Sequence, residues 1–394
     1  MAVDQLAPAA RPPLFYDPRV RAIFFQVLVL GLVVLGAAYL VQNTLSNLAR
    51  QGIASGFGFL DTTAGFSISM SLIQYSEESS YGRAFLVGLV NTLLVSGIGV
   101  FFATLLGFLI GVARLSRNWL VAKMATVYIE ILRNIPLLLQ LFFWYFAVLR
   151  ALPSPRDSVA LFGSFFLNNR GLSSPSPIFE PGFSSVMVAF VIAIFGAVLV
   201  ARWARKRQEA TGEQFPSFWA GTGIIVALPL LAAIFTGFPL SWDYPELRGF
   251  NFVGGMVLIP EFVALVVALS TYTAAFIAEI VRAGIMSVSH GQTEAAFALG
   301  LRRGPTLRLV IIPQALRVII PPLTSQYLNL TKNSSLAAAI AYPDIVLVFA
   351  GTVLMQTGQA VEIIAITMGC YLVISLLISG FMNWYNQKMA LVER

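Results

Sequence analysis

Long apolar runs separated by polar connections are the main feature of this chain. Most runs are about 18 to 25 residues long, the length at which an α-helix crosses the roughly 30 Å hydrocarbon core of a membrane. Eight spans are predicted, at residues 22–41, 85–112, 135–150, 183–201, 217–236, 259–281, 317–338 and 361–384. The pattern therefore predicts an all-α polytopic membrane helix bundle with about eight transmembrane helices.

Composition supports a membrane protein. Of the 394 residues, 58% are hydrophobic and only 11% are charged, whereas about 25% of the residues in a soluble domain are charged. The first apolar run, residues 22–41, exceeds the roughly 7 to 15 residue apolar region of a signal peptide and follows a long polar N-terminus. We interpret it as a retained span.

Basic residues lie in short clusters between the apolar runs and predict the orientation. Seventeen of the 25 Lys and Arg residues fall in the alternate segments that include the N-terminus, and six fall in the others. Such a bias places the positive segments in the cytoplasm. We therefore expect a multi-pass membrane protein with both termini cytoplasmic. The net charge of +7 is then explained by membrane orientation and does not indicate nucleic-acid binding.

The lengths of the connections suggest an insertion. Residues 151–258 contain two spans and a segment rich in Ser, Gly and Pro, and they separate two groups of spans. We predict four parts: 1–83 with a cytoplasmic tail, the first helix and a periplasmic segment; 84–150 as the first part of a core; 151–258 as the insertion; and 259–394 as the second part of the core.

The connection from His290 to Pro313 is amphipathic and too polar to span a membrane. Its stretch TEAAFALG favours a helix that ends at Gly300, the residue type best suited to a left-handed helix terminus. Gly304 and Pro305 can open a second short helix, since proline is tolerated in a first turn, and Pro313 marks the start of the next span. The segment predicts a helix, a turn and a helix along the cytoplasmic face.

These residues resemble the signature loop of the permease subunits of ATP-binding cassette importers. The resemblance rests on Glu294-Ala295-Ala296, Gly300 and Val310-x-Ile312-Pro313 at the family spacing, and residues 290–313 are called the EAA loop below. In that family the loop is a coupling helix that docks on an ATPase subunit. The resemblance implies coupling roles for Gln292, Glu294, Ala295, Ala296, Gly300 and Pro313.

Further segments resemble the histidine and glutamine permeases, which carry polar amino acids. They are the run from Glu130 through Arg133 to Gln140, the segment with Tyr272, Glu279, Arg282 and Gly284, and the run Lys332-Asn333-Ser334-Ser335-Leu336. The resemblance covers about residues 84–150 and 259–390 and implies the five-helix core of a type I importer plus extra helices. The enlarged architecture resembles permeases of general L-amino-acid importers.

The resemblance also implies the function and the partners. The chain is expected to move L-amino acids across the bacterial inner membrane as a transport subunit, not as an enzyme. Expected partners are a nucleotide-binding ATPase subunit that holds ATP and Mg, a second and different permease, a periplasmic amino-acid-binding protein, the L-amino-acid substrate and membrane lipid, with no nucleic acid. No cofactor is expected on this chain.

The absence of other motifs agrees with a transport subunit. No lysine follows a glycine, so the phosphate-binding loop of an ATPase is missing from the sequence. The chain has one histidine and one cysteine, His290 and Cys370. A metal site is not predicted, because it would need two histidines or a cluster of Cys and His. An alternative is an ion-gradient-driven secondary amino-acid transporter, in which Glu130, Glu279 and Lys332 would be ion-coupling groups.

Lys332 is the strongest candidate for the substrate path. It lies fifteen residues beyond Arg317, about 22 Å along a helix, where a charge costs about 2.5 to 3.5 kcal/mol on insertion scales. Three interpretations stay open: a place in the substrate path, an internal ion pair, or a side chain that extends to the membrane surface. The adjacent Asn333, Ser334 and Ser335 offer hydrogen-bond donors for a carboxylate.

Two acid and base pairs share a spacing of three residues, Glu130 with Arg133 and Glu279 with Arg282. This spacing puts each pair on one helix face, as a local ion pair or as a gate below the substrate cavity. Thr92 and Ser96, one helical turn apart, are further candidates for the path. Tyr272 joins this set through the resemblance.

Overall fold

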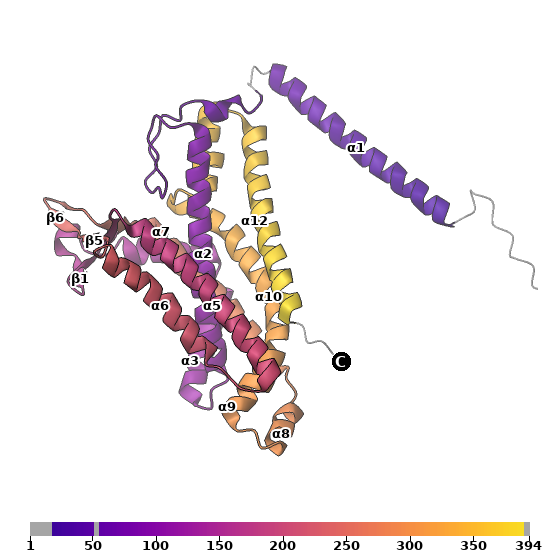
Figure 1. Cartoon of the computed structure of the whole chain (residues 1–394). Helices are drawn as coiled ribbons and strands as arrows, with labels where there is room; N and C mark the ends of the chain where they lie inside the picture. The colour runs from indigo at the N-terminus through magenta and orange to yellow at the C-terminus, as the bar shows by residue number, and fades with distance from the viewer. Residues whose placement is uncertain (1–17, 51–54, 390–394) are drawn as a thin grey trace, which may run out of the picture. The chain divides into compact units, whose positions relative to one another are not determined.

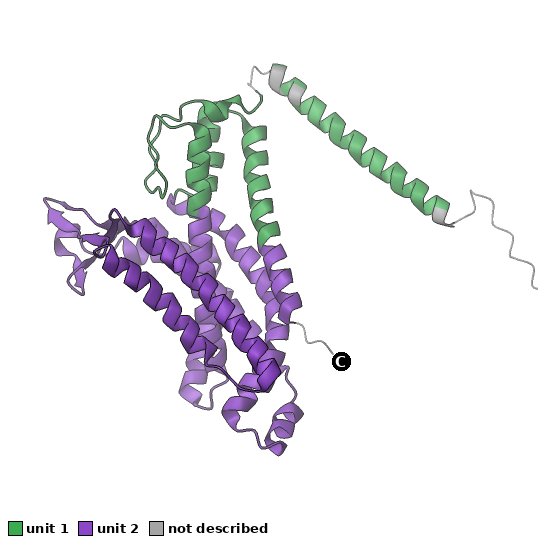
Figure 2. Ribbon diagram, in the orientation of Figure 1, with its two compact units in different colours: residues 1–91, 343–377 green, residues 92–342, 378–394 purple. Residues whose placement is uncertain are grey.

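The computed structural model describes residues 18–50 and 55–389. Residues 1–17, which are most of the predicted cytoplasmic tail before the span at 22–41, lie outside them. Contacts divide the chain into two units, one of residues 1–91 and 343–377 and one of residues 92–342 and 378–394 (Figure 2). Each unit is considered by itself below, and the four-part division expected from the sequence stays a prediction.

Helices make up most of the described residues (Figure 1). The α-helices are α1 Pro18–Arg50, α2 Tyr81–Arg114, α3 Trp119–Asn134, α4 Leu137–Phe142, α5 Phe183–Thr211, α6 Ser217–Phe235, α7 Pro260–Met286, α8 His290–Ala298, α9 Arg303–Thr306, α10 Ile312–Asn333, α11 Leu354–Thr357 and α12 Ala360–Met389. Three short segments are 3-10 helices: η1 Gly58–Asp61, η3 Pro155–Asp157 and η5 Ser334–Ile340. Three are π-helices: η2 Phe143–Leu149, η4 Leu307–Ile311 and η6 Val346–Val353. Among the described residues, seven helices are long and apolar enough to cross a membrane, and eight if one bent pair counts as a span. The predicted all-α membrane bundle is confirmed.

The bent pair corrects the third predicted span. The α4–η2 helix, Leu137–Leu149, falls within the predicted residues 135–150, but it is preceded by α3, which meets it at an angle of 106°. Pro136 causes the break, because a residue before proline is pushed out of the helical region, and Ile135 is extended with φ −98° and ψ 128°. The Gln140 amide donates to the carbonyls of Leu132 and Ile135 at 2.8 and 2.9 Å. It thereby satisfies groups that the end of α3 leaves open.

Helix α7 lies at the centre of the second unit, where it contacts α3, α4, η2 and α10. Glycines allow its close approach to neighbouring helices. At Gly111 of α2, a Cβ would lie 2.7 Å from the Ala278 carbonyl oxygen and 2.8 Å from the Val281 Cβ. A Cβ at Gly284 would overlap Ile319 of α10. Small residues are used this way in membrane bundles, where close packing replaces the hydrophobic effect as the force between helices.

The insertion folds partly into strands, which the sequence did not predict. They are β1 Val159–Leu161, β2 Phe165–Asn168, β3 Gly171–Ser174, β4 Ser176–Phe179, β5 Leu240–Asp243, β6 Glu246–Arg248, β7 Asn251–Val253 and β8 Met256–Leu258. One antiparallel sheet has the order β1-β2-β3-β8, and β4 pairs with β5 and β6 with β7. Strands of three or four residues are too short to show the alternation that indicates a strand. We call β1–β8 and their connections the β module.

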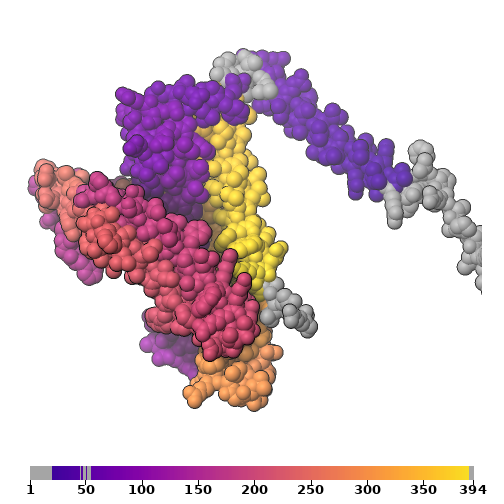
Figure 3. Space-filling model, in the orientation of Figure 1, coloured from indigo at the N-terminus to yellow at the C-terminus, as the bar shows by residue number. Residues whose placement is uncertain are grey.

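Helices α5 and α6 form the rest of the insertion and pack against each other as an antiparallel pair (Figure 1). Gly221 of α6 faces Ala197, and Gly196 of α5 faces Ile224. In the space-filling view the pair forms one face of the second unit (Figure 3). Its outward side chains are apolar and exposed, as at Phe195 and Leu199, which suits contact with lipid tails.

In the first unit, the segment at residues 55–80 folds against the helices rather than remaining a free connection. Phe59 of η1 stacks on Phe349 of η6 with ring centres 6.2 Å apart. The backbone N–H of Gly56 donates to the buried Glu362 carboxylate at 2.8 Å. These contacts cover the start of α12 and order a segment that the sequence marked only as long and polar.

Candidate functional site

The first half of the EAA loop forms the helix that its sequence predicts. Helix α8 ends in a Schellman motif, in which the Leu301 N–H donates to the Ala296 carbonyl at 3.1 Å and the Gly300 N–H donates to the Phe297 carbonyl at 2.9 Å. Gly300 has φ +76°, a conformation that side chains with a Cβ rarely adopt. The glycine therefore sets the direction in which the chain leaves the helix.

The exposed face of α8 has a mixed character. Ala296 is buried, whereas Glu294 and Ala295 are exposed and Leu299 just beyond the helix is 81% exposed. Of the two adjacent alanines, Ala295 thus faces outward and Ala296 packs inside the chain. The His290 Nδ1 lies 3.1 Å from the Glu294 carboxylate. An exposed apolar side chain next to a carboxylate is suited to a protein partner.

The second half of the EAA loop contains the predicted short helix, α9, and Pro313 lies in the first turn of α10, but the two are not separated by a break. Helix α9 begins at Arg303, and the chain continues through η4 and α10 as one apolar helical segment to Ile340. The second short helix is therefore the start of the span itself, and Pro313 lies within it. Because proline lacks an N–H, it interrupts the regular ladder, and the chain passes it through the wider π-type turn η4.

The Gln314 side-chain amide fixes the two halves of the EAA loop to each other. It donates to the Gln292 side-chain oxygen at 3.2 Å and so links α8 to the first turn of α10. A movement of α8 therefore reaches α10 through a direct contact as well as through the chain. Gln292 thus has a structural role within the loop.

A cluster of charges joins the helices at the end of α7 that leads to α8. Arg282 Nε lies 3.1 and 3.2 Å from the two Glu279 oxygens, so this predicted ion pair is present. Glu279 also accepts a hydrogen bond from Arg114 at the end of α2. These three side chains are only about 20 to 27% exposed. We call Arg114, Glu279 and Arg282 the Glu279 cluster.

Glu130 and Arg133 do not form the second predicted pair in the described residues. Glu130 instead lies 4.0 Å from Arg114, and the Arg133 guanidinium lies over the Phe276 ring at 5.2 Å. The Glu130 side chain is 59% exposed, where an ion pair contributes little. The sequence did not indicate Arg114 as a partner of Glu279, because nothing local relates it to a carboxylate 165 residues away.

Lys332 lies exposed in the last turn of α10. Within residues 18–50 and 55–389 it has no ion pair in this chain, so the internal ion pair is the interpretation with the least structural support. The Ser334 and Ser335 hydroxyls donate to the carbonyls of Thr331 and Lys332, each at 2.7 Å. Both hydroxyl protons are therefore occupied at the end of the helix, and Asn333 is partly buried.

The remaining candidates for the path are covered by protein. Thr92 is fully buried and Ser96 is 6% exposed, so neither offers much surface to a substrate in this conformation. Tyr272 is partly buried, and its ring lies 5.0 Å from that of Phe276. Of Thr92, Ser96, Tyr272 and Lys332, only Lys332 is exposed.

Comparison with known proteins identifies the family. Residues 211–391 match the family described as "Binding-protein-dependent transport system inner membrane component". The chain is 58% identical to the general L-amino acid transport system permease protein AapQ of Rhizobium johnstonii, over 96% of this chain and 94% of the relative. It is 59% identical to the putative amino-acid ABC transporter permease protein YhdX of Escherichia coli, over 96% and 97%.

This chain is an amino-acid permease of the ATP-binding cassette importer family. The permease is a multi-pass inner-membrane protein and a transport component rather than an enzyme, and its relatives are not ion-coupled transporters. A third relative, the probable glutamine ABC transporter permease protein GlnM of Bacillus subtilis, is 32% identical over 93% of its length but matches only 54% of this chain. The permease is thus much longer than this relative.

A second polar cluster of the permease, which the sequence did not indicate, lies at the opposite end of α7. The Tyr145 hydroxyl donates to the Glu261 carboxylate at 2.7 Å. It accepts from Arg150 Nη2 at 2.8 Å. The π-type turn η2 brings Tyr145 and Arg150, five residues apart, onto one face, since the Arg150 N–H donates to the Tyr145 carbonyl. We call these three residues the Tyr145 cluster.

Proposed function

We propose that this permease forms a path for L-amino acids and is driven by an ATPase subunit that docks on α8 and the turn at Gly300. The observation that carries the proposal is the exposed helix with Glu294 and Leu299 at its surface and a glycine-terminated end that orients it. ATP and Mg belong to the ATPase chain, and this chain supplies the path and the coupling surface.

The orientation follows from the same surface. An ATPase supplied with cellular ATP requires the EAA loop to lie in the cytoplasm, and the basic Arg302, Arg303 and Arg308 in this loop agree with the positive-inside rule. With that loop inside, the connections between α5, α6 and α7 place the β module outside. Both termini are then cytoplasmic.

We further propose that the permease pairs with a different permease and receives substrate from a binding protein. The family description names a binding protein, and AapQ is named as part of a general L-amino acid transport system. This chain is enlarged by the α5–α6 pair and the β module relative to the shorter GlnM. We therefore expect the partner permease to be a chain of another size that lacks this insertion and completes the membrane core.

In the proposed mechanism the Glu279 cluster closes the path on the cytoplasmic side. Glu279 holds α2 and α7 together through Arg114 and Arg282, directly before the EAA loop. ATP binding moves α8 and thereby α7, which separates or restores these contacts. Two states with different contacts for the substrate are sufficient for transport, and Lys332 offers a charge for the substrate carboxylate in one of them.

Purification and reconstitution of the complex test this function. We expect mass spectrometry of the purified complex to find an ATPase, a second permease and bound L-amino acid. Proteoliposomes should take up an equimolar mixture of L-amino acids when ATP and a binding protein are supplied, and an uncoupler should have no effect. Uptake that needs an ion gradient but not ATP would contradict the proposal.

A further inference from the structure

The β module is a folded part of the permease rather than a set of mobile loops. Phe166 of β2 stacks on the buried Phe252 of β7 with ring centres 4.6 Å apart. Arg156 of η3 lies over the Phe250 ring at 4.0 Å and donates to the Gly249 carbonyl at 3.3 Å. These contacts join the segment before α5 to the segment after α6. The two halves of the insertion therefore form one small body.

The Tyr145 cluster anchors this body to the core at the two points where the chain enters and leaves it. Arg150 stands at the entrance, directly after η2, and Glu261 stands in the first turn of α7, three residues after β8. Tyr145 is 5% exposed and the Glu261 side chain 17%, so the hydrogen bond between them is largely shielded from water, whereas the Arg150 side chain is 54% exposed. A force on the β module is thus transmitted to the start of α7.

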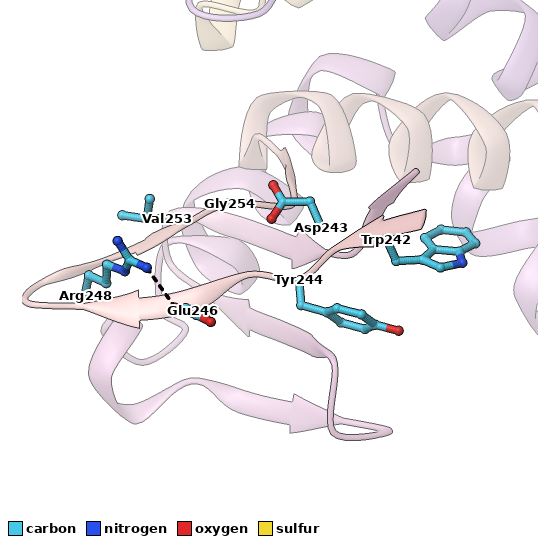
Figure 4. A pocket seen from close by; sticks show the side chains of 7 residues that line it. All are labelled: Trp242, Asp243, Tyr244, Glu246, Arg248, Val253 and Gly254. Carbon is cyan, nitrogen blue, oxygen red and sulfur yellow. Dashed lines mark hydrogen bonds and ion pairs between the residues drawn. The ribbon is translucent and has the colours of Figure 1, made fainter. Parts of the chain in front are cut away.

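A hollow of about 370 Å³ opens on the surface of the β module (Figure 4). Its lining is Trp242, Asp243, Tyr244, Glu246, Arg248, Val253 and Gly254. About half of each of the two large aromatic side chains, Trp242 and Tyr244, is exposed. Exposed Trp, Tyr and Arg side chains are the types that contribute most to binding at protein interfaces.

The charges of the hollow argue against two other occupants. Arg248 pairs with Glu246 at 3.1 Å, and Asp243 accepts from the Gly255 N–H at 2.8 Å, so each charged group already has a partner within the module and none is reserved for a free amino acid. Three charged side chains also make the hollow unsuitable for lipid tails. A polar, aromatic surface of a folded module fits a water-soluble protein.

We infer that the hollow around Trp242 and Tyr244 is a docking surface for the substrate-binding protein of this importer. The inference rests on the proposed function, which places the β module outside and supplies the binding protein. The relative GlnM matches only 54% of this chain, although the match spans 93% of GlnM itself. A permease therefore needs much less chain than this one has, and the β module adds an interaction. Docking there reaches the Glu279 cluster and α8 through the Tyr145 cluster and α7.

Titration of the binding protein tests the surface. The probe is the binding protein that supports uptake in the proteoliposomes described above, loaded with an equimolar mixture of L-amino acids. Trp242→Ala is expected to raise the concentration needed for half-maximal ATPase stimulation about tenfold. The matched control Trp219→Ala removes a 74% exposed tryptophan at the opposite end of α6 and should leave this concentration unchanged.

Photo-cross-linking of purified components gives a direct second measurement. Tyr244 is replaced by benzoylphenylalanine, and the expected product is an adduct with the binding protein. Adducts with lipid alone would overturn the inference. Quenching of Trp242 fluorescence by free amino acids would also overturn it, because such quenching indicates that the hollow binds amino acids. If the binding protein stimulates the ATPase activity of Trp242→Ala at the same concentrations as for the parent, only the docking surface is contradicted. If no binding protein stimulates the parent complex, the proposed function is contradicted.

Discussion

At the scale of single residues, Glu279 is the only carboxylate of the Glu279 cluster and serves two arginines, Arg114 and Arg282. The sequence could predict its partner three residues away, because both lie on one helix face. It could not predict Arg114, which comes from another helix. The pair on the same helix is thus local chemistry, and the contact between helices depends on the fold.

Replacement of this carboxylate should destabilise the permease. Glu279→Gln leaves two partly buried arginines without a charged partner, and we expect the free energy of unfolding to fall by about 1 to 3 kcal/mol. The matched control Glu130→Gln removes an exposed carboxylate 4.0 Å from the same Arg114 and should cost less than about 1 kcal/mol. Thermal unfolding in detergent measures both, and equal midpoints for the two variants would contradict the role of Glu279.

Lys332 should be needed for transport but not for assembly. Lys332→Met keeps most of the side-chain length and removes the charge that we propose to meet the substrate carboxylate, so we expect ATP-driven uptake to fall about tenfold or more. The control Lys388→Met removes a lysine that lies over the Trp384 ring at the end of α12 and should transport like the parent. Parental uptake by Lys332→Met, with unchanged substrate dependence, would remove Lys332 from the path.

At the scale of elements, the bent span depends on one side chain as well as on Pro136. Gln140 satisfies two carbonyls at the break between α3 and α4. Gln140→Leu leaves them without a donor, and we expect a loss of about 1 to 3 kcal/mol in the free energy of unfolding. Gln208→Leu on the exposed end of α5 is the control. If both variants unfold at the parental midpoint, Gln140 does not stabilise the bend.

The elements also show what sequence patterns can reveal. Long apolar helices such as α5 and α6 follow from composition alone, and the α8 helix and its turn at Gly300 follow from residues close together in the chain. The β module could not be found this way, because β3 pairs with β8, Leu172 opposite Leu258, across two intervening helices. Likewise, the Ser334 and Ser335 hydroxyls were expected to serve a substrate, but the open carbonyls at the end of α10 are nearer acceptors.

At the scale of the whole molecule, the permease should require a second, different permease. Co-expression of this chain with the ATPase alone is expected to give a complex without ATP-driven uptake, because we propose that a different permease completes the membrane core. Addition of the second permease should restore uptake. Full uptake from this chain and the ATPase alone would indicate a homodimer.

The coupling of this chain to an ATPase is tested most directly at Gly300. Gly300→Asp places a side chain and a charge at a turn with φ +76° on the surface proposed to dock the ATPase, and we predict that the reconstituted complex loses ATP-driven amino-acid uptake and binds the ATPase about tenfold more weakly. Gly212→Asp makes the same change at φ +75° in the connection between α5 and α6 and should transport like the parent. Parental uptake and ATPase binding by Gly300→Asp would contradict the account.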